Sequence, residues 1–237
     1  MAALGLAAPA GALDNQAQYE ACMSLLQRDP GGALDSAVEW ERQGGGDAAR
    51  HCKALALIRT GAVEDGALEL ERVAQTMPQA QAPLAAELFA QAGQAWTKAG
   101  HQQRALYAQD EGLKLDPKNV ELLIDRALTY GTTGMYLEAL DDLNAAVDLA
   151  PDNPDIYAMR AAAYRQLEKP DLAEDNIEHA LKLSPSHPSA LLERGYLRRA
   201  KGDVAGARTD WLTVIQVMPG TAAAEEAQKN IQKLDIK

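Results

Sequence analysis

The adjacent residues His51 and Cys52, in the stretch Arg50–Lys53, are of types that form reactive sites. The chain of 237 residues has one other cysteine, Cys22. A thiol beside an imidazole could be a nucleophile with its base, part of a metal site, or a structural feature. The pair alone leaves these three interpretations open, so the choice depends on the elements that position it.

The rest of the chain shows no residue pattern that would perform chemistry. The four histidines lack H-E-x-x-H spacing, the cysteines lack C-x-x-C spacing, and no G-x-x-x-x-G-K-[ST], G-x-G-x-x-G or G-x-S-x-G occurs. The triple glycine before Asp47 lacks the lysine that would reach a phosphate. We therefore expect a protein that is not an enzyme and holds no cofactor or metal.

The composition limits the kinds of partner. Acidic residues outnumber basic ones by 34 to 23, which gives a net charge of −11. Contacts to phosphates need clustered Lys and Arg, so nucleic acid is not an expected partner. The content of 24% charged and 47% hydrophobic residues is typical of a folded soluble protein. No run of 18 apolar residues occurs, and no transmembrane segment is expected.

The first thirteen residues, MAALGLAAPAGAL, carry no charge and end in two overlapping A-x-A patterns, Ala8–Ala10 and Ala10–Ala12. They resemble the second half of a secretory signal peptide, without its positively charged front. The alternative is a disordered Ala-rich terminus. We expect residues 1–13 to be one or the other and the protein to be periplasmic or otherwise exported, with a cytoplasmic location as the alternative.

Glycine and proline recur along the chain at a nearly fixed interval. Five residues each lie midway between two segments in which apolar residues recur at helical spacing. They are Gly61, Gly100, Gly134, Glu168 and Gly202, and the distances between them along the chain are 39, 34, 34 and 34 residues. The same spacings separate Pro78, Pro117, Pro151, Pro185 and Pro219. Self-similarity at such a period indicates a repeat architecture.

This pattern resembles the tetratricopeptide repeat (TPR), in which each 34-residue unit forms two antiparallel helices. The helices of a unit cross closely at repeat positions 8 and 20, where bulk would force them apart. Position 8 holds Ala21, Ala54, Gly93, Ala127, Ala161 and Gly195, and position 20 holds Ala33, Gly66, Ala105, Ala139, Ala173 and Ala207. Since Ala and Gly supply 64 of the 237 residues, twelve small residues at twelve positions do not arise by chance.

The resemblance implies an all-α fold, a right-handed α-solenoid of about six TPR units with a C-terminal capping helix. The units would be residues 14–46, 47–80, 86–119, 120–153, 154–187 and 188–221, all within one domain, 14–237. In the segment 222–237, one helical face would carry Ala224, Ala227, Ile231 and Leu234. That helix would cover the exposed apolar side of the last unit. Because it is polar outside, we expect a monomer rather than end-to-end stacking.

An arginine recurs where leucine is usual in the family, at repeat position 7: Arg126, Arg160 and Arg194. Position 23 of the same units carries Asp142, Asn176 and Asp210. An unpaired buried charge is very costly, so we expect each arginine to pair with the facing Asp or Asn. Recurrence at the repeat period favours this structural ladder over a catalytic arginine.

Peptide-binding members of the family contact their ligands from the concave surface, through first-helix positions 2, 5, 6, 9, 12 and 13. Here the polar candidates are Gln91, Gln94, Lys98, Asp125, Arg165 and Arg199, and the others are Ile124, Leu128, Met159, Leu192 and Tyr196. Packing between adjacent first helices is the alternative role for the apolar ones. Position 9 has no Asn and position 5 no Lys, so the carboxylate clamp of chaperone-binding TPRs is not expected.

The resemblance leads to a functional hypothesis. We expect a non-enzymatic interaction scaffold that binds an extended peptide or a helix of another protein in the concave groove. The alternative is a regulatory or substrate-presenting subunit of a cell-envelope enzyme complex.

The repeat register also bears on the opening question. First helices of neighbouring TPR units lie side by side, and the register places Cys22 and Cys52 on the first helices of units one and two. In an exported chain, two such cysteines are most economically read as one disulfide. His51 would then be an ordinary surface side chain. A nucleophilic cysteine or two free thiols remain the alternatives.

Overall fold

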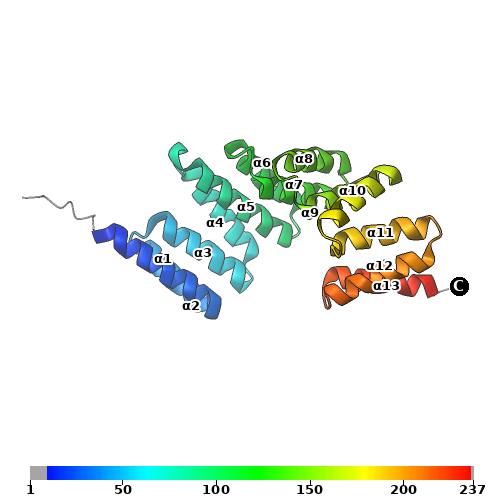
Figure 1. The fold of residues 1–237 in the computed structure, drawn as a ribbon. Coiled ribbons are helices and arrows are strands. Elements are labelled where there is room, and N and C mark those ends of the chain that lie inside the picture. The colour runs from blue at the N-terminus through cyan, green and yellow to red at the C-terminus, as the bar shows by residue number, and fades with distance from the viewer. Residues whose placement is uncertain (1–9, 236–237) are drawn as a thin grey trace, which may run out of the picture. The chain divides into compact units, whose positions relative to one another are not determined.

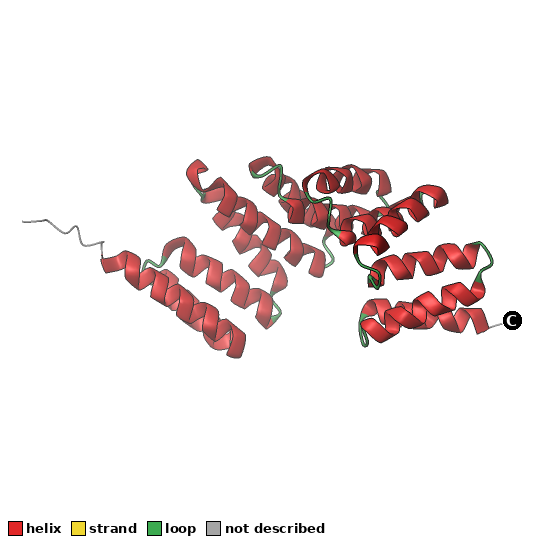
Figure 2. Ribbon diagram, viewed as in Figure 1, coloured by secondary structure: helices red, strands yellow, loops and turns green. Residues whose placement is uncertain are grey.

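The computed structural model describes residues 10–235, and all regular structure in that range is helical. Figure 1 traces the helices in chain order, and Figure 2 shows them joined by short loops. They are α1 (Ala10–Arg28), α2 (Pro30–Arg42), α3 (Gly46–Thr60), α4 (Val63–Thr76), the 3-10 helix η1 (Gln79–Gln81), α5 (Ala82–Lys98), α6 (Gln102–Leu115), α7 (Val120–Thr132), α8 (Tyr136–Leu149), α9 (Pro154–Gln166), α10 (Pro170–Leu183), α11 (Pro188–Ala200), α12 (Val204–Val217) and α13 (Ala222–Asp235). The predicted all-α repeat fold is confirmed.

The chain divides into two compact units, one ending at Pro117 and the other beginning at Lys118. In the first, each α-helix from α1 to α6 packs against the next, and α1 also lies against α3. In the second, each helix from α7 to α13 packs against the next, and α7, α9, α11 and α13 pack on one another in sequence. Contact between alternate helices is what stacked helix pairs produce. A single solenoid over residues 14–237 stays a prediction.

The turn inside a helix pair needs a residue in the left-handed backbone region. Gly61, Gly100, Gly134 and Gly202 have φ angles between 79° and 100°. Glycine adopts this conformation without steric cost because it has no Cβ. Glu168 occupies the same place with φ 57° and is the one residue with a side chain that does so in the described chain. The period seen in the sequence therefore reports a backbone requirement.

In the second compact unit, α9 and α11 each begin at a side chain that caps the free amides of the helix. Asn153 Oδ1 accepts a hydrogen bond from the amide of Asp155 at 3.0 Å, directly before Pro154. His187 Nδ1 accepts one from the amide of Ala190 at 3.3 Å, directly before Pro188. Proline at the first helical position lacks an N–H that the helix would leave unbonded anyway.

The close helix crossings form as expected, with one exception. Eleven of the twelve small residues predicted at crossings are buried, but Ala21 is exposed. In α1 the buried residue is Cys22, whose Sγ lies 3.8 Å from the carbonyl oxygen of Ala33. The assignment of Ala21 is wrong because Asp29 alone joins α1 to α2, whereas the other pairs have longer linkers, and this shifts the register of α1 by one residue.

The core of each unit is built from these crossings and a few large side chains. In the second unit, Trp211 is fully buried and packs with Leu192, Val214 and Ile231. A Cβ added to Gly195 would lie 2.2 Å from Trp211 Nε1, so this crossing accepts only glycine. In the first unit, a comparable cluster contains Leu70, Leu88, Phe89 and Trp96.

The two ends of the chain match the sequence analysis in part. In α13, Ala224, Ala227 and Ile231 are buried and Leu234 packs against the same cluster as Trp211. Residues 1–9, which include Ala8 and Pro9 of the Ala8–Ala10 pattern, lie outside the described residues, whereas residues 10–13 belong to the first turn of α1. In the described range, none of the helices combines the length and hydropathy that crossing a bilayer requires.

Candidate functional site

Two rungs of the arginine ladder are bidentate ion pairs. Arg126 donates to the carboxylate of Asp142 at 2.8 and 2.6 Å. Arg194 donates to Asp210 at 3.0 and 2.7 Å. Both carboxylates are buried, so each needs its guanidinium partner. These arginines tie the two helices of a pair together, which is a structural role.

The middle rung differs from the prediction. Asn176 Nδ2 donates to the carbonyl oxygen of Leu172 at 2.7 Å, one turn back on its own helix. Arg160 Nε is buried without a hydrogen-bond partner, and its guanidinium lies 6.0 Å from the ring of Tyr164. The expected pairing of Arg160 with Asn176 is therefore wrong, because the amide donates where the neighbouring carboxylates accept.

His51 is held inside a hydrogen-bonded chain rather than exposed as expected. The Tyr19 hydroxyl donates to Nδ1 at 2.8 Å, and Nε2 donates to Gln91 Oε1 at 2.9 Å. Gln91 in turn donates to Glu87 Oε1 at 3.2 Å. Burial lowers the pKa of His51, and the hydrogen bond to Gln91 opposes this. The neutral imidazole thus links α1, α3 and α5.

The structure places the sulfur atoms of Cys22 and Cys52 at disulfide-bonding distance, with their Cα atoms 6.5 Å apart. The two side chains are 3% and 0% exposed. A nucleophilic thiolate needs access and a base, and both ring nitrogens of His51 already have partners. Among residues 10–235, no three His, Cys, Asp or Glu side chains are grouped to hold a metal ion. The arrangement favours a structural role for the His51–Cys52 pair.

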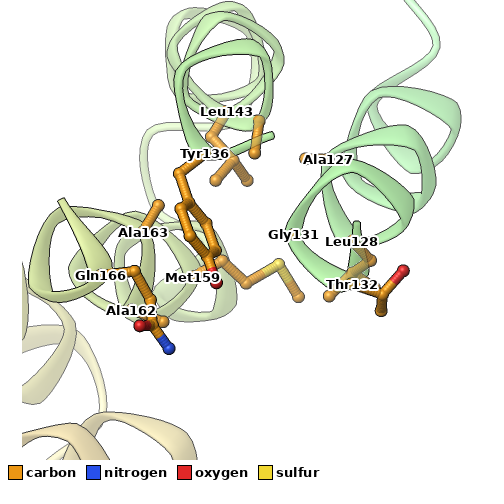
Figure 3. A pocket seen from close by; sticks show the side chains of 11 residues that line it. Ala127, Leu128, Gly131, Thr132, Tyr136, Leu143, Met159, Ala162, Ala163 and Gln166 are labelled. Carbon is orange, nitrogen blue, oxygen red and sulfur yellow. The ribbon is translucent and has the colours of Figure 1, made fainter. Parts of the chain in front are cut away.

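A pocket of about 270 Å³ lies among α7, α8 and α9, and we call it the α7–α9 pocket. Figure 3 shows Tyr136 extending from α8 towards Met159, whose side chain points from α9 towards Leu128 on α7. The lining consists of Ala127, Leu128, Gly131, Thr132, Tyr136, Ala139, Leu143, Met159, Ala162, Ala163 and Gln166. Its polar groups are hydroxyls and one amide, so the pocket is apolar and carries no charge.

The pocket is open because a glycine and an alanine, Gly131 and Ala162, stand where the next repeat has an arginine and a tyrosine. Thirty-four residues after Gly131, Met159 and Ala162 come Arg165, Glu193 and Tyr196. Arg165 donates to Glu193 at 2.5 and 3.2 Å, and its guanidinium lies 4.6 Å from the centre of the Tyr196 ring. These three side chains occupy the space between α9 and α11 that is equivalent to the pocket. The ladder arginines and the core residues recur in both repeats, whereas these three space-filling side chains occur only in the later one.

Helix α13 makes further contacts with Tyr196, one of the side chains that fill this space. The hydroxyl of Tyr196 donates to Glu226 and accepts from Asn230 Nδ2 at 2.8 Å. Burial, followed by the hydrogen bond to Glu226, raises the pKa of Tyr196 to about 12. Arg165 and Tyr196, which were expected to meet a ligand, therefore bind groups of their own chain.

Of the residues expected to line the groove, the structure brings Leu128 and Met159 together in the α7–α9 pocket. Leu192 is 9% exposed and packs against Trp211, so its assignment to the groove is wrong. Ile124 and Asp125 are partly buried on α7 and do not line the pocket. The remaining predicted groove residues do not line the pocket. Gln94 and Lys98 are exposed on α5, and Arg199 is exposed on α11.

The sequence analysis missed the pocket residues outside the six first-helix positions. It also missed four residues at those positions: Gly131 at position 12, Thr132 and Gln166 at position 13, and Ala162 at position 9. The available signal was the contrast between Gly131 and Arg165 at equivalent positions of consecutive repeats. A Cβ added to Gly131 meets no atom within 4 Å, which shows that this glycine borders open space.

Two family models, both described as tetratricopeptide repeat, match residues 94–163 and 154–187. Residues 94–187 therefore match the tetratricopeptide-repeat family. Outside these ranges, the pairs α3–α4 and α11–α12 have the same turn glycine and small residues at the crossing.

Solved structures with the same fold include PilF from Pseudomonas aeruginosa, with a TM-score of 0.69 and 14% identity over 92% of this chain and 98% of the other. MamA from Desulfovibrio magneticus RS-1 has a TM-score of 0.62 and 22% identity over 77% and 96%. YrrB, described as a TPR protein with an unusual peptide-binding site, has a TM-score of 0.61 and 18% identity over 78% and 97%. No curated protein sequence matches the chain.

Proposed function

We propose that the protein is a non-enzymatic interaction module that binds a segment of another protein through the α7–α9 pocket. The observation that carries the proposal is an open apolar pocket on a repeat scaffold that fills the equivalent space one repeat later. Leu128 at its edge is 47% exposed and adds apolar surface beside the apolar lining of the pocket. YrrB supports the proposal as a protein of the same fold with a described peptide-binding site.

The pocket is suited to one buried side chain of the partner. A concave apolar site with a few polar groups at its edge is the usual form of a ligand site. Met159 is flexible and can adjust to the shape of the incoming group. Anchors of this kind contribute about 2 kcal/mol or more when they are hot spots.

The test uses selection from a library of displayed random peptides, followed by measurement of Kd for synthetic versions. Gly131→Trp should fill the pocket without a backbone clash, and Leu128→Lys should place a charge at its edge. We expect each to weaken binding by about tenfold or more. Leu137→Lys is the matched control, because Leu137 on α8 is 65% exposed and does not line the pocket. Peptides that bind wild type and Gly131→Trp equally would refute the proposal.

We also propose that the protein works in an oxidising compartment. Support comes from the buried Cys22 and Cys52 at disulfide-bonding distance, because disulfides persist outside the reducing cytosol. Intact-mass analysis of protein from its native compartment should show two hydrogens missing, and alkylation only after reduction. Two thiols that react without reductant in unfolded samples would contradict this location.

A further inference from the structure

The occupant of the α7–α9 pocket can be specified from the charges around it, and this step rests on the function proposed above. The lining itself is uncharged, so a charged anchor would lose its hydration without gaining a partner. The anchor is therefore an apolar side chain. The residues that flank it in the partner would face the surrounding surface.

Two carboxylates lie on the same helix faces as Met159 and Leu128, which line the pocket. Asp155 precedes Met159 by one helical turn on the same face of α9, and its side chain is 60% exposed although one oxygen accepts from His187 Nε2 at 3.0 Å. Glu121 precedes Leu128 by two turns on the same face of α7 and is exposed.

The three basic residues of the same helices do not line the pocket. Arg126 on α7 is bound to Asp142, and Arg165 on α9 is bound to Glu193. Arg160 on α9 has no carboxylate partner, and its guanidinium lies 6.0 Å from the ring of Tyr164. The helix behind the pocket, α8, contains three acidic residues besides the paired Asp142 and neither Lys nor Arg. Charge of one sign around an uncharged apolar site produces a potential that attracts the opposite sign.

We infer that the partner segment is basic: an apolar side chain enters the α7–α9 pocket, and Lys or Arg residues next to it face Glu121 and Asp155. Apolar burial supplies the anchor, and charge selects which apolar segments bind. An acidic segment with the same anchor is rejected because like charges would be brought together.

Three fluorescein-labelled synthetic peptides of equal length test this inference. Each has a central Leu flanked on both sides by two Lys, two Ser or two Glu, and Kd is measured by fluorescence anisotropy. At low salt we expect the Lys peptide to bind about tenfold more tightly than the Ser peptide, and the Glu peptide more weakly than both. High salt should reduce the Lys advantage to about twofold, because exposed charges are screened.

Isosteric variants separate charge from pocket. Glu121→Gln with Asp155→Asn should remove the Lys preference and leave the Kd of the Ser peptide unchanged. Asp171→Asn with Asp175→Asn on α10, which does not line the pocket, is the matched control and should keep the preference. Equal Kd values for the Lys and Ser peptides at low salt would overturn the inference.

The pocket variant distinguishes this failure from a failure of the proposed function. If Gly131→Trp weakens both peptides while they bind equally, the pocket is the site and the basic character is wrong. If Gly131→Trp changes neither Kd, the proposed function fails as well. A wild-type dimer in analytical ultracentrifugation that Gly131→Trp dissociates would show that a second copy occupies the pocket, which also overturns the inference.

Discussion

At residue 176 an amide stands where the neighbouring repeats have a carboxylate, and this leaves Arg160 Nε without an acceptor. Asn176→Asp should supply the bidentate partner that Arg126 and Arg194 already have. Since a buried unsatisfied donor costs about 1–3 kcal/mol, we expect the free energy of unfolding to rise by about 1 kcal/mol.

Urea denaturation followed by circular dichroism measures this change. The control is the opposite exchange in an intact rung, Asp142→Asn, which should lower the free energy of unfolding by about 2 kcal/mol. A destabilised Asn176→Asp protein would show that Arg160 does not lack an acceptor.

The hydrogen-bonded position of His51 makes a prediction about pH. Because burial lowers its pKa below the ordinary value of 6.5, the unfolded chain takes up this proton before the folded protein does. The stability that the neutral ring contributes is therefore present above pH 6.5 and is lost as the pH falls through the lowered pKa.

NMR titration of the imidazole should give a midpoint for His51 below 6.5. Tyr19→Phe removes the donor to Nδ1, which stabilises the neutral ring, so the midpoint of that variant should move upward. A wild-type midpoint at or above 6.5 would be incompatible with the buried, doubly bonded ring.

At the scale of the helix pair, the turn between α9 and α10 has a glutamate where four equivalent turns have glycine. Glu168 adopts φ 57°, where a residue with a Cβ loses about 1 kcal/mol or more relative to glycine. We expect Glu168→Gly to raise the free energy of unfolding by about 0.5–1 kcal/mol, as measured by thermal and urea denaturation.

The reverse exchange at an equivalent turn is the control for that measurement. Gly134→Glu, at φ 79°, should lower the free energy of unfolding by about 1 kcal/mol. If Glu168→Gly were the less stable protein, the glutamate side chain would make a contribution larger than the backbone cost.

The sequence predicted helix pairs well, because their requirements are local. A left-handed turn favours a glycine and a close helix crossing requires a small side chain, and each can be recognised from a single position in the sequence. The register of α1 was missed because the length of the Asp29 linker matters only once both helices are placed. The pocket was missed because the missing side chain at Gly131 has meaning only beside Met159 and Ala162, which belong to the next repeat.

At the scale of the molecule, the division at Pro117 and Lys118 suggests an experiment on a fragment. All residues that line the α7–α9 pocket belong to the second compact unit, and so does the cluster around Trp211. We expect residues 118–237 to fold alone, because repeat stability is largely a sum of local terms.

Circular dichroism and peptide anisotropy test the fragment. It should be helical, unfold cooperatively and bind the peptides selected on the full chain with Kd values within about threefold. Loss of the helical signal would show that the second unit depends on the first. A folded fragment without binding would place part of the site before residue 118.

The contrast between Gly131, Met159 and Ala162 and their equivalents Arg165, Glu193 and Tyr196 has a consequence for evolution. Three substitutions separate an open pocket from a closed one, and none of them falls at a turn glycine, a helix crossing or an arginine rung. Descent with modification can therefore open, close or relocate the binding site from repeat to repeat while selection preserves the scaffold. Relatives with the same fold would then diverge first in where they bind.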